Sequence, residues 1–415
     1  MKTTSTDDSS AGGVTPVAPD AATLESEKES MLRQPVAVWA TALACVFAFM
    51  GIGLVDPILP AIAENLDAGP SQVSLLFTSY FAVTAVMMLV TGAVSSRVGG
   101  KRTLLTGLTL IVIFAALAGT SGSVGELVAF RAGWGLGNAL FVATALAVIV
   151  AVASGGRAVA IILYEAALGL GMACGPLVGA VLGDLNWRGP FFGTAVLMLI
   201  ALLVLVVKLP STPVTGERTS FAAPLRALRH GGLFGVSFSA LFYNFGFFTV
   251  LAYTPFLLDS GEYGIGLVFF GWGSALAVFS VFIAPVFQNR VGAANTTMLT
   301  LCGLVAVYVL LGVFHGTPWV VTVLVVVSGA LLGVNNTMYT EMAMSVSDNP
   351  QPVASAAYNF VRWMGGVIAP FASTELAEKF DPSVPYFTAA AAAVVAVTVM
   401  LFTRSAVEVH GPHAV

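Results

Sequence analysis

The sequence predicts an all-α integral membrane protein of twelve transmembrane helices, arranged as two pseudo-symmetric bundles of six. Three observations carry this prediction. Hydrophobic residues make up 57% of the 415 residues, charged residues make up 9%, and the mean hydropathy is +0.92. Apolar stretches long enough to cross a bilayer recur along the chain, and its second half repeats motifs of the first. Since a soluble domain of this length could not hydrate so apolar a surface, the bilayer is the expected solvent.

The apolar stretches predict six spans in each half of the chain. About 20 helical residues cross the ~30 Å of hydrocarbon in a bilayer. Most of the polar connections between the stretches are too short to hold a soluble domain. The expected helices run at roughly 36–62, 72–96, 103–121, 124–153, 158–182, 191–207, 233–258, 267–287, 296–314, 320–345, 354–376 and 386–403.

Paired motifs indicate that the two halves are a duplication. Residues 164–176 (YEAALGLGMACGP) and 358–370 (YNFVRWMGGVIAP) share a Tyr, an interior Gly and a closing Pro at a separation of 194 residues. Nearly the same separation relates Gly135–Asn138 to Gly333–Asn336, Arg97–Gly99 to Arg290–Gly292, and Asp56–Pro57 to Thr254–Pro255. Duplicated membrane halves are typical of transporters whose substrate site lies between the repeats.

The polar segments predict the domain boundaries and the orientation. We expect a disordered tail at 1–34, one half at 35–207, a central loop at 208–232, the other half at 233–404 and a second tail at 405–415. The first tail lacks the features of a signal peptide. If both tails and the central loop are cytoplasmic, 13 of the 17 Lys and Arg residues lie on that side, as the positive-inside rule favours. A multi-pass protein of the cell membrane with both termini cytoplasmic is therefore expected.

Composition argues against an enzyme, a metal protein or a cofactor site. The four His residues lie in expected loops or in the second tail, so they cannot ligate a metal or complete a Ser-His-Asp set at membrane depth. No GxxxxGK[ST] loop for nucleotide phosphates is present. The three Cys residues lie in apolar helices and do not suggest a disulfide framework. Transport driven by an ion gradient is the remaining kind of work.

Several motifs resemble those of the major facilitator superfamily, in particular its twelve-span drug:proton antiporters. Residues 171–180, GMACGPLVGA, are similar to the motif gxxxGPxxGG, and Trp187 and Arg188 begin an entry to the sixth helix of the family's type. Residues 51–60 (GIGLVDPILP), 92–102 (GAVSSRVGGKR) and 131–139 (RAGWGLGNA) resemble the family's first-helix, second-loop and fourth-helix motifs. The resemblance implies the two-bundle fold and alternating access, with export of drug-like compounds.

Two sets of residues are expected to act in conformational change. The second-loop motif supplies Gly92, Ser96, Arg97, Gly99, Lys101 and Arg102. Ser96 stands where the family carries the Asp of its cytoplasmic latch, so the strength of that latch here is open. Gly171, Gly175 and Gly179 form one face of the fifth helix beside Pro176, and we expect this face to pack closely on a helix of the other half.

Charges within the apolar spans are the expected proton-coupling residues. They are Asp56, Glu165, Arg131 and Arg362. A charge in hydrocarbon is unfavourable unless it is paired or neutralised, so each is a candidate for function. Asp56 alternatively lies solvated at the external mouth. Glu165 and Arg362 could pair across the cavity or each act alone, and the alternative is a structural ion pair with a different neighbour. The resemblance implies a proton-transfer role for Arg131, while Glu126 is its possible local partner.

Aromatic and amide side chains are the expected substrate contacts. The set is Tyr243, Asn244, Phe247, Asn335, Asn336, Tyr358 and Asn359. Aromatic side chains would suit a lipophilic ligand and amides would orient it, although part of the aromatic wall of the seventh helix could equally face lipid.

These observations favour proton-coupled efflux of lipophilic or cationic small molecules by alternating access. The alternatives are proton-linked transport of a sugar or organic anion, and a receptor or scaffold that does not transport. The expected partners are a small-molecule substrate, protons and the lipid bilayer, without nucleic acid and with the protein as a monomer.

Overall fold

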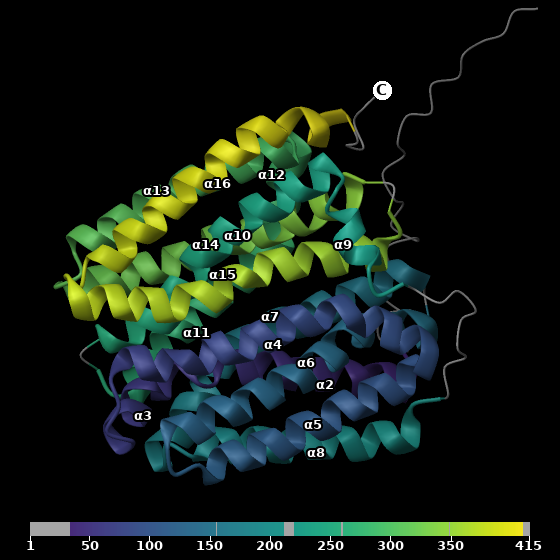
Figure 1. The fold of residues 1–415 in the computed structure, drawn as a ribbon, viewed down its shortest axis with the longest axis horizontal. Helices are drawn as coiled ribbons and strands as arrows, with labels where there is room; N and C mark the ends of the chain where they lie inside the picture. The colour runs from purple at the N-terminus through teal and green to yellow at the C-terminus, as the bar shows by residue number, and fades with distance from the viewer. Residues whose placement is uncertain (1–33, 155, 211–219, 259, 348, 410–415) are drawn as a thin grey trace, which may run out of the picture.

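The fold is all-helical across the part of the chain that the computed structural model describes, residues 34–154, 156–210, 220–258, 260–347 and 349–409. In Figure 1 most helices of the first half lie below, in purple to teal, and most of those of the second half lie above, in teal-green to yellow. The predicted two-bundle architecture is confirmed.

Within those ranges the first half consists of six long helical segments. They are α2 (Val36–Gly53), continued by η1 (Asp56–Ile58) and α3 (Leu59–Asn65), then α4 (Pro70–Val98), α5 (Gly100–Thr120), α6 (Val124–Val152), α7 (Gly156–Leu185) and α8 (Gly189–Lys208). The short helix α9 (Ala223–Ala227) follows in the central connection.

The second half repeats this order. Its elements are α10 (Gly231–Tyr253) with η2 (Thr254–Phe256), α11 (Glu262–Val278) with the π-helical turn η3 (Phe279–Ile283) and α12 (Ala284–Val291), then α13 (Ala293–Val313), α14 (Pro318–Ser345), α15 (Gln351–Lys379) and α16 (Val384–Val409). The expected helices agree with the observed ones to within a few residues at most ends.

Eleven segments of the described chain are long and apolar enough to cross a membrane. The twelfth, α15, is 29 residues long and falls outside that group. It carries Asn359, Arg362, Glu375 and Glu378 along its length, which lowers its hydropathy. A span that keeps such side chains is a candidate for function.

The duplication is visible in the backbone. Gly99 and Gly292, 193 residues apart, both take positive φ angles, +94° and +82°, at the junction of two helices. Only glycine adopts this conformation without strain. In both halves the first helix breaks into a 3₁₀ turn at the paired positions, η1 and η2, because each turn contains a Pro that donates no backbone hydrogen bond.

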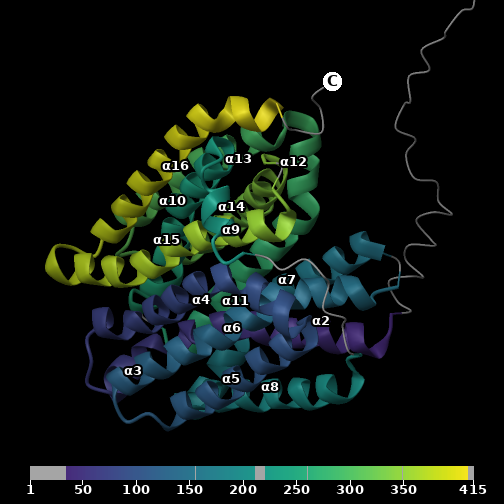
Figure 2. The ribbon, with the colours of Figure 1, turned by 45° about the vertical axis from the view of Figure 1, so that its right-hand side comes forward.

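The two halves meet along two pairs of helices, α4 with α15 and α7 with α11. Figure 2, a view turned by 45°, also shows α15 beside α4. We call the side on which α2 begins and α16 ends the terminus face, and the opposite side the far face. The contacts between the halves lie in the far-face half of these helices. The hydroxyls of Ser74 and Thr374 are hydrogen-bonded there, and Gly266 packs so closely on Ala180 that an added Cβ would clash with it.

Candidate functional site

Asp56 lies in the interior of the first half, in the turn η1. The residue is fully buried, and neither carboxylate oxygen has a hydrogen-bond partner within the described structure. The break before Pro57 places this side chain inside the bundle. An apolar interior seldom holds a polar group without a partner, and such exceptions concentrate at functional positions.

Arg131, on α6, is the charge that acts on Asp56. The guanidinium is fully buried and its three nitrogens have no hydrogen-bond acceptor in the described chain. It lies over two aromatic rings instead, with its Cζ 4.5 Å from the Tyr80 centroid and 4.6 Å from the Trp134 centroid. Cation–π contact of this kind stabilises a desolvated guanidinium. Asp56, Arg131, Tyr80 and Trp134 therefore form one site, which we call the acidic centre.

Glu126 is not the partner of Arg131. Its carboxylate accepts the backbone N–H of Gly122 at 2.8 Å, at the exposed start of α6. Ser123 caps the same turn by accepting the N–H of Glu126. Glu126 and Arg131 are five residues apart, which places them on different sides of the helix. This spacing agrees with the finding that they do not pair.

The acidic centre is next to the contact between the halves. A Cβ built on Gly53 would lie 3.7 Å from Oδ2 of Asp56 and 3.0 Å from Cδ of Pro176 on α7. On the other side, the carbonyl of Pro176 would lie 3.0 Å from a Cβ on Gly266 of α11. The turn η1 itself packs against both α7 and α11. The turn that carries Asp56 therefore borders the second half directly.

A second polar cluster surrounds Arg362 on α15. Nη2 of Arg362 donates to Oδ1 of Asn336 at 2.6 Å, and Nη1 donates to the Tyr358 hydroxyl at 3.4 Å. Nδ2 of Asn244 donates to the Arg362 carbonyl at 3.1 Å. Four of the predicted site residues are brought together here, from α10, α14 and α15.

Three aromatic rings join this cluster to the first half. Phe81 of α4 lies 4.3 Å from Phe248 and 5.0 Å from Trp363 between ring centroids. Trp363 Nε1 is buried and has no hydrogen-bond partner among the described residues. Sequence reasoning passed over Phe81 and Trp363. Trp363 could have been found from its place beside Arg362 within the repeated motif, whereas Phe81 carries no comparable signal.

The other expected substrate residues lie inside the second half. The Tyr243 hydroxyl donates to the Leu332 carbonyl at 3.0 Å, and Phe247 packs edge-on against Trp272. Asn335 is fully buried, and its Oδ1 accepts no hydrogen bond from the part of the chain that the structure describes. Asn359 bonds to Ser355 on its own helix. The side chain of Glu165 is outside the described residues, and so is the suggested pairing of Glu165 with Arg362.

The glycine face of the fifth span packs within its own half, not against the other half as expected. A Cβ on Gly171 would lie 2.5 Å from the Val46 carbonyl, and one on Gly175 would lie 2.7 Å from that of Met50. Gly179 meets the Leu54 carbonyl in the same way. All three carbonyl groups belong to residues on α2 or directly after it. The spacing predicts one face of α7 correctly, but the neighbour on that face is the first helix.

The second-loop motif lies at the terminus face. Ser96 Oγ donates to the Ala93 carbonyl at 3.0 Å, and Arg97 donates to the same carbonyl and lies over the Phe221 ring at 4.4 Å. Lys101 donates to carbonyls at the end of α8, Val206 at 3.4 Å and Leu209. A Cβ on Gly92 would meet no atom of the described residues within 4 Å. These contacts stay within the first half and the connection that follows it.

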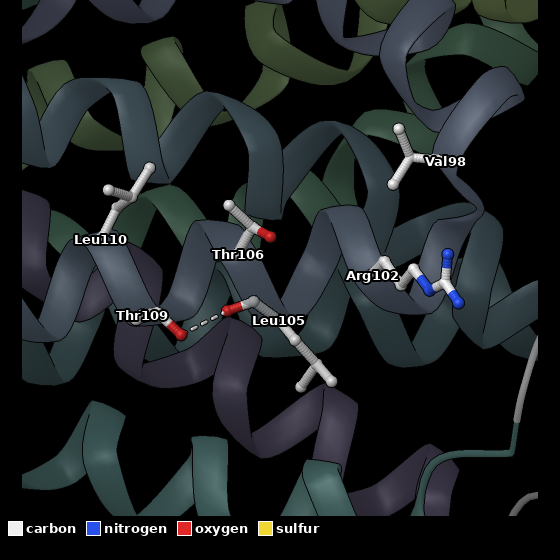
Figure 3. A pocket seen from close by; sticks show the side chains of 6 residues that line it. All are labelled: Val98, Arg102, Leu105, Thr106, Thr109 and Leu110. Atoms are coloured by element: carbon white, nitrogen blue, oxygen red, sulfur yellow. Dashed lines mark hydrogen bonds between the residues drawn. The ribbon is translucent and has the colours of Figure 1, made fainter.

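Arg102 borders a shallow pocket on α5, shown in Figure 3 with Val98, Leu105, Thr106, Thr109 and Leu110. The Thr109 hydroxyl is bonded to the Leu105 carbonyl at 2.8 Å. This pocket contains none of the other predicted site residues. No group of three His, Cys, Asp or Glu side chains in the described ranges could hold a metal ion.

Comparison with known proteins gives one family for nearly the whole chain. The family model "Major Facilitator Superfamily" matches residues 41–370. A multidrug efflux protein of Bacillus subtilis, YfmO, is 49% identical over 93% of this chain and 97% of its own length. The tetracenomycin C resistance and export protein of Streptomyces glaucescens is 30% identical over 47% of this chain and 38% of its own. Among solved structures, a D-xylose-proton symporter covers 88% of this chain and 96% of its own at 16% identity, with a TM-score of 0.71.

Proposed function

Because this chain belongs to the major facilitator superfamily, we propose that it exports lipophilic or cationic small molecules in exchange for protons bound at Asp56. The observation that carries the proposal is the acidic centre, in which a buried carboxylate that has no hydrogen-bond partner among the described residues interacts with the charge of a buried arginine. The relative from Bacillus subtilis, described as a multidrug efflux protein, supports the direction and the breadth of transport.

The acidic centre supplies a reason for coupling. An ionised Asp56 attracts Arg131, whereas a protonated Asp56 leaves the guanidinium held by Tyr80 and Trp134 alone. Protonation therefore changes the energy of the packing between η1, α7 and α11. A ligand shifts a two-state equilibrium only through different affinities for the two states, and the proton is such a ligand here.

The conformation described above fits the state that is open to the cytoplasm. Helices α4, α7, α11 and α15 contact one another in their far-face halves. We assign the terminus face to the cytoplasm from the positive-inside rule, so the closed side is external. Substrate would then enter from the cytoplasm and reach the Arg362 cluster and the ring group of Phe81, Phe248 and Trp363.

The proposal is tested with purified protein in liposomes under an imposed pH gradient. We expect accumulation of a fluorescent lipophilic cation only when the gradient drives protons in the opposite direction. Coupled movement of protons, followed with a trapped pH dye, separates a transporter from a receptor or scaffold. Substrate movement that ignores the gradient would contradict proton coupling.

A second candidate, transport of an organic anion, is favoured by the positive charge of Arg362 beside two amides and a tyrosine. The variants Arg362→Gln and Arg362→Lys separate the two. For an anion, loss of the charge should lower transport about 30-fold or more, since an unpaired buried ionic partner is costly, and Lys should restore part of it. For a lipophilic cation we expect less than about a ten-fold effect in either variant. Parallel uptake assays of one anionic and one cationic dye measure the difference.

Ser96→Asp tests whether the cytoplasmic latch can be restored. The new carboxylate lies beside Arg97 and near the basic start of α5, and it should attract partners when the terminus face closes. A charge-assisted hydrogen bond contributes roughly 1.5–3 kcal/mol, enough to shift the equilibrium about ten-fold toward the form open at the far face. Labelling of single-cysteine probes on each side measures the shift.

Ser95→Asp is the control for that experiment. It adds the same charge one residue earlier, about 100° around α4. An identical labelling ratio in parent and Ser96→Asp would mean that the terminus face closes through other contacts.

A further inference from the structure

Three polar contacts join α4 to α15 in the far-face half of the molecule. The hydroxyls of Ser74 and Thr374 lie 2.9 Å apart, and the Thr78 hydroxyl donates to the Val367 carbonyl at 2.9 Å. The third, nearest the far face, is a hydrogen bond of 2.9 Å from the backbone N–H of Ser71 to Oε1 of Glu378. Of these three contacts, the bond to Glu378 is the one that involves a charged group.

Glu378 completes the N-terminus of α4. This helix begins at Pro70, and its N-cap residue is Gly69, which has no side chain to accept the first N–H groups. The carboxylate of Glu378 takes that place from the other half, and it lies so close that a Cβ on Gly69 would be 3.4 Å from Oε1. A negative charge at this position also interacts favourably with the helix dipole.

Neighbouring charges on the same stretch are engaged elsewhere. Lys379 pairs with Glu375, with Nζ and Oε1 2.6 Å apart. The carboxylate of Asp381 accepts the N–H and hydroxyl of Ser383, which hold the pKa of Asp381 below its ordinary value. Glu378 is therefore the acid of this group that reaches the first half.

We infer that Glu378 is an external latch, a carboxylate that binds the start of α4 and stabilises the conformation closed at the far face. The bond joins two elements from different halves, so it breaks when their far-face ends separate. Opening of the far face then leaves the N–H of Ser71 to water. The inference rests on the proposed function for its place in a transport cycle, but the state preference itself requires no substrate.

The test compares Glu378→Gln and Glu378→Ala with Glu375→Gln. Gln keeps an acceptor but loses the charge, and Ala loses both. Glu375→Gln removes the same charge one turn earlier on α15, from a surface pair within its own helix. Spin labels at Thr120 and Val313, exposed residues at the far-face ends of α5 and α13, report opening of that face by double electron–electron resonance. The background replaces Cys45, Cys174 and Cys302.

We expect Glu378→Gln to raise the population open at the far face roughly three- to ten-fold, and Glu378→Ala to raise it further, with Glu375→Gln close to the parent. Equal shifts in the Glu375 and Glu378 variants would assign the effect to surface charge and overturn the latch. An unchanged distance distribution in both Glu378 variants would also overturn it. Because the measurement needs no transported compound, a failure of the efflux proposal would leave this result interpretable.

Discussion

Asp56→Asn is expected to abolish proton-driven transport while the protein still folds and inserts. The amide has nearly the shape of the carboxyl group but cannot gain or lose a proton. The interaction with Arg131 would then be independent of the pH on the side to which the site is open. A pH gradient would therefore have no titrating group at this site to act on. Transport of a lipophilic cation in liposomes, with and without a pH gradient, measures the loss against the parent.

Asp67→Asn is the matched control for this substitution. Asp67 is an exposed acid of the same half with a φ of +48°, a conformation that Asn tolerates as well as Asp. We expect this control to transport at the parent's rate. If Asp56→Asn transports equally well under the gradient, proton coupling must lie elsewhere, and Glu165 becomes the first alternative.

The spans and the candidate charges could be predicted because the bilayer restricts the sequence so strongly. A helix in hydrocarbon must be long and apolar, and the stretch 354–376 is apolar enough to indicate even α15, the most polar of the twelve spans in the described chain. Few charges survive at membrane depth, which singles out Asp56, Arg131 and Arg362. The pairing of Arg97–Gly99 with Arg290–Gly292 in the sequence is matched in the structure, where Gly99 and Gly292 both take positive φ angles at equivalent junctions.

The partners of those residues could not be predicted, because periodicity defines a face of a helix but not the helix that covers it. The row of Gly171, Gly175 and Gly179 was found from its spacing, yet its neighbour is α2. Likewise, nothing in the sequence places Tyr80 and Trp134 around Arg131, since the three come together only through packing of α4 on α6. Tertiary packing decides these contacts.

Gly175→Leu is expected to destabilise the first half and to stop transport. A Cβ at this position would lie 2.7 Å from the Met50 carbonyl and 3.3 Å from its Cα, so even Ala is tight and Leu must push α2 away from α7. Overpacking of this kind typically costs about 1–3 kcal/mol, and occasionally more. Because α2 leads directly into η1, the same displacement moves Asp56 relative to Arg131. Thermal unfolding in detergent and transport in liposomes measure the two effects.

Gly125→Leu separates this close packing from a general intolerance of large residues at helical glycines. Gly125 is also helical and in the same half, but a Cβ there would meet no atom of the described chain within 4 Å. We expect that variant to unfold at the parent's temperature and to keep its transport rate. If Gly175→Leu matched it in both assays, α2 and α7 could separate freely, and the close approach of their backbones would not be what holds Asp56 in place. Loss of transport at unchanged stability would instead assign the glycine row to movement between states, because a helix pair that must slide requires small side chains along its contact.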